Sequence, residues 1–148
     1  MVLMHRDGQA PRLFDLLAAG LPYGTYTSDD TGLIKGVYYR PLLEYARTQY
    51  GLGGEVHPQL SLDEVLRRLS VGASFVMVSV HKDIRHPERL PPLRGGHLVL
   101  VVGHDAARRT LHFRNPSGHT PETRAAELSI PTFARFFAER GVTLTLRP

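Results

Sequence analysis

The feature that most constrains the fold is a run of five consecutive apolar residues, Leu98–Val102. It follows Gly95-Gly96-His97 and precedes Gly103-His104-Asp105. A strand with apolar side chains at both parities has to be covered on both of its faces. The run therefore predicts a central strand of a sheet that lies between other layers of the molecule.

The segments around this run complete the expected fold. Further strands are predicted over 75–80, 110–115 and 142–146, and the polar connection 105–109 predicts an antiparallel hairpin. Helical spacing of apolar residues predicts helices over 12–19, 41–50, 61–70 and 131–140. Ser61 and Glu64 have the spacing of a capping box for the third helix. The expected class is α+β, a helical front half packed on a mostly antiparallel sheet.

Composition narrows the range of functions. The chain has 148 residues, enough for one domain with a single core. No apolar stretch approaches the roughly 18 residues of a membrane span, and no signal peptide is recognisable, so a complete chain would be cytoplasmic. The net charge is +4, but the arginines are scattered and form no basic run. No nucleic-acid partner is therefore expected.

His97 is the first candidate for chemistry. Two glycines deliver the chain to this histidine at the start of a buried strand, and glycine permits close backbone approach or unusual dihedral angles. The side chain would then lie at the rim of the sheet, where clefts form. The alternative is a hydrogen-bonded histidine at the sheet edge that has no catalytic function.

Asn115 is the second candidate. It shares parity with Leu111 and Phe113, and the hairpin brings the end of its strand towards His97. In a favourable register its amide would orient the imidazole, the task of the third member of a catalytic triad. A slip of one residue would place the two side chains on opposite faces. Asn115-Pro116-Ser117-Gly118 is equally typical of a simple turn.

The sequence offers no clear nucleophile and no metal site. It contains no cysteine. Hydroxyl groups are available, but none lies in a G-x-S-x-G pattern; they belong to Thr25, Thr27, Ser28, Ser74 and Ser79. His97 and His104 are seven residues apart, which predicts opposite faces and a separation of about 20 Å along a strand. No metal or other cofactor is therefore expected.

The back half of the chain resembles the C39-like branch of the papain-like cysteine peptidases. That family pattern has an apolar strand, a proline-rich loop, Gly-His, a second apolar strand, Gly-Tyr-Asp, a hairpin and Asp-Pro or Asn-Pro. This sequence has the matching segments in order, namely 75–80, 81–94, Gly96-His97, 98–102, Gly103-His104-Asp105 and Asn115-Pro116. The segments 133–141 and 142–146 resemble the closing helix and strand of the family.

The resemblance implies a single C39-like peptidase domain over residues 1–148. It implies that His97 is the catalytic histidine and Asn115 the residue that orients it. The front half is similar to the family's helical lobe, through 36–51 and the helix from Ser61. His104 stands where the family has an aromatic residue, and no role is carried over to it.

The departure from the family is the nucleophile. Family members carry a cysteine at the start of their first helix, and Met1-Val2-Leu3-Met4 resembles the later part of that helix. The cysteine would then fall one to two turns upstream of Met1, in a segment missing from this chain. A sheet face left uncovered by that helix would favour self-association.

Three hypotheses follow. The first is a cysteine peptidase that hydrolyses a peptide or related amide and is incomplete as given. The second is an inactive pseudo-peptidase that binds a peptide or a protein partner. The third is a metal- or serine-dependent hydrolase built around His97.

Overall fold

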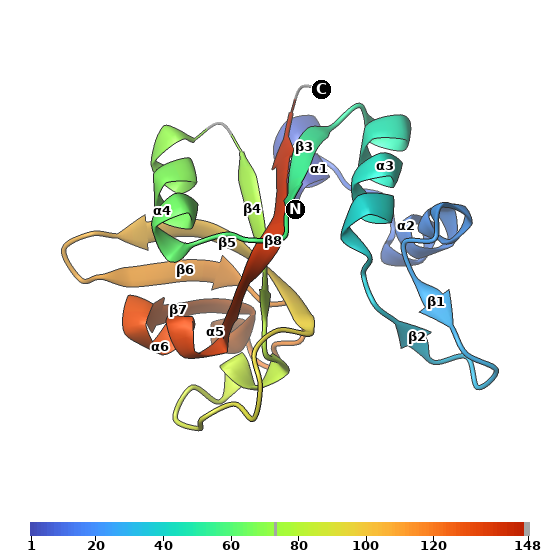
Figure 1. Ribbon diagram of the computed structural model, residues 1–148. Coiled ribbons are helices and arrows are strands. Elements are labelled where there is room, and N and C mark those ends of the chain that lie inside the picture. The colour runs from blue at the N-terminus through green and yellow to red at the C-terminus, as the bar shows by residue number, and fades with distance from the viewer. Residues whose placement is uncertain (73, 147–148) are drawn as a thin grey trace. The chain divides into compact units, whose positions relative to one another are not determined.

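The computed structural model describes residues 1–72 and 74–146, and these form two compact units (Figure 1). The N-terminal unit consists of Met1–Val56 with the segment from Leu144 onward. The sheet unit is His57–Thr143. Each unit has buried apolar residues of its own.

The largest sheet has six strands in the order β3-β8-β4-β5-β6-β7. Their bounds are β3 Gly53–His57, β4 Phe75–Val80, β5 His97–Asp105, β6 Thr110–Arg114, β7 Ala125–Ser129 and β8 Phe137–Thr145. The pairs β4–β5, β5–β6 and β6–β7 are antiparallel. The expected α+β class and the expected hairpin β5–β6 are confirmed, whereas β3 and β7 carry no alternation strong enough for the sequence to predict them.

Strand β5 has the central position that its apolar run predicts. Val99, Leu100 and Val101 are all buried, so both faces of the strand are covered at these residues. Val102 departs from the prediction, because 43% of its surface is exposed. The ladder between β5 and β6 changes register between Val101 and Gly103, which makes Val102 the extra residue of a β-bulge.

Two helices cover one face of the sheet unit, α4 (Leu62–Val71) and α6 (Ile130–Phe136) (Figure 1). Their buried side chains join those of the strands in one apolar cluster, made of Leu60, Val65, Val76, Val78, Val80, Ile84, Val99, Val101, Leu111, Phe113, Phe133, Phe136 and Phe137. The shorter elements of this unit are η2 (Lys82–Arg85) and α5 (Pro121–Arg124).

The start of α4 follows the sequence in part. The Ser61 hydroxyl accepts a hydrogen bond from the Glu64 N–H at 3.1 Å, as a helix cap should. The Glu64 carboxylate instead pairs with Arg67 and Arg68, each at 2.6 Å. The carboxylate therefore pairs with cations one turn further along the helix. In a capping box it would instead accept a hydrogen bond from the backbone N–H of Ser61.

The expected helix over 131–140 is wrong at its end. Helix α6 stops at Phe136, and Phe137 begins β8. The backbone of β8 packs tightly on β4, since a Cβ added at Gly141 would lie 2.2 Å from the Met77 carbonyl oxygen. Strand pairing therefore ends the helix earlier than the helical spacing of the phenylalanines predicts. Phe133, Phe136 and Phe137 are nevertheless all buried, as expected.

The N-terminal unit is mainly helical. It contains α1 (Val2–Asp7), α2 (Leu13–Gly20), η1 (Leu21–Tyr23), a hairpin of β1 (Thr27–Ser28) and β2 (Ile34–Lys35), and α3 (Tyr39–Tyr50). The expected helices 12–19 and 41–50 are confirmed, and Gly51 ends α3 in a left-handed conformation. Gly20 is the last residue of α2 rather than its stop, because η1 follows directly.

A tyrosine holds the N-terminal unit together. Tyr45 is buried, and its hydroxyl donates to the Leu16 carbonyl at 3.2 Å and lies 3.1 Å from the Tyr50 hydroxyl. The Arg6 guanidinium donates to the Tyr50 carbonyl. Burial raises the pKa of Tyr45 above its usual range, and the neighbouring Tyr50 adds to the effect. Polar contacts thus link α1, α2 and α3.

Candidate functional site

His97 and Asn115 lie against each other in the sheet unit. The His97 Nε2 atom is 2.8 Å from the Asn115 Oδ1 atom. His97 is the first residue of β5, and Asn115 immediately follows the last residue of β6. The two residues that the sequence singled out are therefore hydrogen-bonded across the end of the β5–β6 hairpin.

The bulge at Val102 makes this contact possible. From Asp105↔Thr110 to Gly103↔His112 the hairpin pairs in one register, and beyond the bulge Val101 pairs with Phe113. Strand parity then places Asn115 on the same face as Val101, Val99 and His97. Continued without the bulge, the first register would pair Asn115 with Leu100 and turn its side chain to the opposite face.

The orientation of the Asn115 amide follows from a second donor. The Ser117 backbone N–H donates to the same Oδ1 atom at 3.0 Å. An oxygen that already accepts from a backbone N–H is the acceptor towards His97 as well, so Nε2 is the ring nitrogen that carries the proton. The lone pair then belongs to Nδ1. This is the tautomer in which a histidine takes a proton through Nδ1.

Two glycines fix the start of β5. Gly95 and Gly96 have φ values of 88° and 92°, in the left-handed region that other residues rarely adopt. Gly95 is also closely packed, since an added Cβ would lie 2.9 Å from the Ala138 Cβ. The Gly96 N–H donates to the Ser79 Oγ at 3.2 Å. The expected unusual dihedral angles are confirmed at both glycines, and close approach is confirmed at Gly95 alone.

Asn115 serves the local turn as well as the histidine. Its N–H donates to the Arg124 carbonyl at 2.9 Å, and its carbonyl accepts from the Gly118 N–H at 3.1 Å. Its side chain is buried, and within the described residues its Nδ2 atom has no hydrogen-bond partner. The same residue therefore holds the turn through its backbone and contacts His97 through its side chain.

The hydroxyl groups that the sequence offers as candidates do not complete a triad with His97. Ser79 pairs with Leu98, and the next residue Val80 pairs with His97, so Ser79 faces the other side of the sheet. Ser74 precedes the opposite end of β4, about 20 Å away at the rise of a strand. Thr25, Thr27 and Ser28 belong to the N-terminal unit.

The expected parity of His104 is wrong. Because the bulge shifts the register, His104 pairs with Leu111 and shares the face of His97 instead of the opposite one. Their separation along β5 is still about 20 Å by strand rise. Among residues 1–72 and 74–146, no group of three or more histidine, aspartate or glutamate side chains is placed to hold a metal ion.

Two features of the site escaped the sequence reasoning, the bulge and the Ser117 N–H. A glycine at the end of an apolar strand is a signal for a bulge, and Gly103 directly follows Val102. The Ser117 contact is an Asx turn, which an Asn-Pro-Ser-Gly segment favours. Both signals are present in the sequence, but neither gives the register without the paired strand.

No helix in the described part of the chain is long and apolar enough to cross a membrane. No family model matches the sequence, and a search of curated proteins gives no match. Among solved structures, the chain is similar to the peptidase domain of Streptococcus ComA, a bi-functional ABC transporter involved in a quorum sensing pathway. The TM-score is 0.63 at 14% identity, over 97% of this chain and 84% of that one. The protein has the fold of a C39-type peptidase domain.

Proposed function

We propose that residues 1–148 belong to one C39-like cysteine peptidase domain in which His97 is the general base and Asn115 orients it. The hydrogen bond of 2.8 Å between His97 Nε2 and Asn115 Oδ1 carries this proposal. The fold of the similar peptidase domain supports it. Because the 148 residues include no cysteine, this proposal requires a nucleophile from a segment outside them.

In this mechanism the thiol gives its proton to Nδ1 of His97, and the thiolate attacks the carbonyl carbon of the substrate. The imidazolium then protonates the leaving amine, and a covalent thioester remains. Water, deprotonated by Nδ1, hydrolyses the thioester and releases the thiol. Asn115 keeps Nε2–H engaged throughout, which holds Nδ1 towards the reacting atoms but supplies no charge to the imidazolium.

One observation favours a second function. All 148 residues lack cysteine, and neither Ser74 nor Ser79 lies beside His97 in its place. In a pseudo-peptidase the same His97 and Asn115 pair would donate and accept hydrogen bonds to a bound peptide or protein. The partner would then be held at this pair without being cleaved.

The intact mass of the protein from its native cells separates these functions. A mass well above 16.5 kDa, with a cysteine in the additional N-terminal residues, supports the peptidase. That longer protein should hydrolyse peptides, and Cys→Ala should abolish the activity. A mass that matches this chain, with peptide binding and no hydrolysis, would instead establish the pseudo-peptidase.

Substitutions at the pair test the assigned roles in the longer protein. His97→Ala should lower kcat/KM by at least about a hundredfold, the contribution typical of general base catalysis. Asn115→Ala should have a smaller effect, since it removes only the orientation of the ring. His104→Gln is the matched control on β5 and should keep full activity. Activity that survives His97→Ala would contradict the proposal.

The tautomer can be measured on the 148-residue chain itself. Nitrogen-15 NMR should find the proton of neutral His97 on Nε2, and Asn115→Ala should let the ring populate both tautomers. Deletion of Val102 should have the same effect, because it turns Asn115 away from His97. An Nδ1–H tautomer in the wild-type chain would remove the basis of both assignments.

A further inference from the structure

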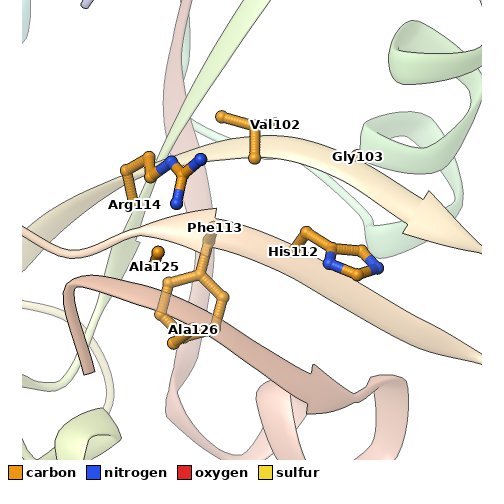
Figure 2. Close-up of a pocket in the computed structure, with 7 residues that line it drawn as sticks. All are labelled: Val102, Gly103, His112, Phe113, Arg114, Ala125 and Ala126. Carbon is orange, nitrogen blue, oxygen red and sulfur yellow. The ribbon is translucent and has the colours of Figure 1, made fainter. Parts of the chain in front are cut away.

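A shallow hollow of about 290 Å³ lies across β5, β6 and β7, where the bulge leaves the regular ladder (Figure 2). Small residues line it on two of the strands, namely Gly103, Ala125 and Ala126. A Cβ added at Gly103 would meet no heavy atom within 4 Å, so this part of the hollow is open. The bulge thus creates space on the sheet surface as well as setting the register.

The hollow is separate from the His97 site. The larger side chains that line it include those of His112 and Arg114. These two residues alternate along β6 with the core residues Leu111 and Phe113. Figure 2 shows the Phe113 ring directed towards Ala126, away from the Arg114 side chain. His97 lies on the face of Phe113, so the side chains of His112 and Arg114 belong to the opposite face of the sheet.

Arg114 brings an uncompensated positive charge to the hollow. It is exposed, and among the described residues no carboxylate pairs with it. Its partners across the ladder are Leu100 on β5 and Ala125 on β7, both apolar. Arg108 on the same hairpin is different, since it contacts Asp105 at 2.8 Å and Glu127 at 3.2 Å.

The surroundings of Arg114 limit the ligand further. Val102 is 43% exposed and lines the same hollow as Arg114 (Figure 2). Ala125 is exposed on the other side of β6. A guanidinium next to small apolar groups suits a carboxylate that has an apolar substituent, because the guanidinium binds both carboxylate oxygens and the substituent covers Val102.

We propose that this hollow binds a carboxylate attached to a short apolar group, as at the C-terminal residue of a peptide, with Arg114 as its anchor. The proposal does not depend on the chemistry at His97. It also applies whether the protein cleaves peptides or only binds them.

The test is an NMR titration of the 148-residue chain at low ionic strength. N-acetylvaline is the probe, and N-acetylvalinamide, which lacks the charge, is its control. N-acetylvaline should shift the Arg114 Nε–H and the Gly103 amide signals in a saturable way. N-acetylvalinamide should shift neither of these two signals. Equal shifts with both probes would overturn the proposal.

Two variants test separately the positive charge of Arg114 and the open volume at Gly103. Arg114→Ala should weaken N-acetylvaline binding by at least about tenfold, since it removes the charge-assisted hydrogen bonds. Gly103→Val keeps the charge but fills the open part of the hollow, and it should also weaken binding. Arg89→Ala removes an exposed arginine elsewhere and should bind as the wild type does. Unchanged binding in Arg114→Ala would refute the assignment.

Peptides then identify the source of the carboxylate. Acetyl-Ala-Ala-Val with a free C-terminus and acetyl-Ala-Glu-Ala-amide both carry one carboxylate, but only the first has it next to an apolar side chain. Stronger binding of the first supports a peptide C-terminus. Equal or stronger binding of the second would overturn that part of the proposal and assign the hollow to acidic side chains.

Discussion

The two units of this protein are stabilised by different means. The sheet unit has a continuous apolar cluster. In it the rings of Phe113 and Phe133 pack edge to face, with their centroids 5.4 Å apart. The N-terminal unit has fewer buried apolar residues and relies on the hydroxyl contacts of Tyr45. It also exposes many large apolar side chains, among them Met1, Met4, Leu13, Phe14, Leu21, Leu33 and Ile34.

This difference shows where each unit is vulnerable. Apolar burial stabilises in proportion to the area removed from water, so the sheet unit should lose most from a cavity. The N-terminal unit should respond more to the loss of a single hydroxyl group than to truncation of an exposed apolar side chain. The candidate site rests on the unit with the larger core, and a rigid sheet suits a hydrogen bond that depends on register.

The largest effect is expected at the centre of the sheet unit. Phe133 is fully buried, and Phe133→Ala would leave a cavity in the apolar cluster. The free energy of unfolding should fall by about 3–5 kcal/mol. Urea denaturation followed by circular dichroism measures this loss. Phe133→Leu is the control, and it should recover most of the stability; equal losses for both variants would rule out a cavity.

The next effect belongs to the N-terminal unit. Tyr45→Phe keeps the ring but removes the hydroxyl that donates to Leu16 and lies against Tyr50. The free energy of unfolding should fall by about 1–2 kcal/mol, because neutral hydrogen bonds are lost and the partly buried Leu16 carbonyl loses this donor. Tyr39→Phe, in the first turn of the same helix, is the control. Hydrogen exchange should then accelerate in α2 and α3 first.

A smaller, pH-dependent effect is expected at α4. The hydrogen bond from Arg67 is the main cause that lowers the pKa of Glu64 from 4.5 to about 2, and Arg68 contributes further. Because the folded pKa is the lower one, the stabilisation is complete above pH 4.5 and is lost as the pH falls towards 2. Glu64→Gln should flatten the stability profile in that window. A profile identical to that of the wild type would contradict this account.

The smallest effect on stability is expected at an exposed apolar residue. Phe14 is 81% exposed, so Phe14→Ser should change the free energy of unfolding by less than about 0.5 kcal/mol. It should instead reduce the self-association that exposed apolar surface favours. Sedimentation velocity at increasing concentration measures this. An association constant unaffected by Phe14→Ser and by Leu13→Ser would place the contact elsewhere.

Local patterns predicted several elements well. Phe75–Val80 is a strand with the expected bounds, and α4 presents Val65 to the core with Leu62, Leu66 and Leu69 beside it. These elements follow from periodicity and from a helix cap, which act within a few residues. Helix α6 was predicted too long, because the pairing of β8 with its neighbours overrode the helical spacing of its phenylalanines.

By itself the sequence determined the α+β class, the central place of β5 and the identity of His97 and Asn115 as candidates. These depend on residue type and on spacing within one element. The tertiary structure decided whether the two side chains meet. A single extra residue at Val102 changes the face of every side chain that follows, and only the paired strand β6 defines where that residue lies.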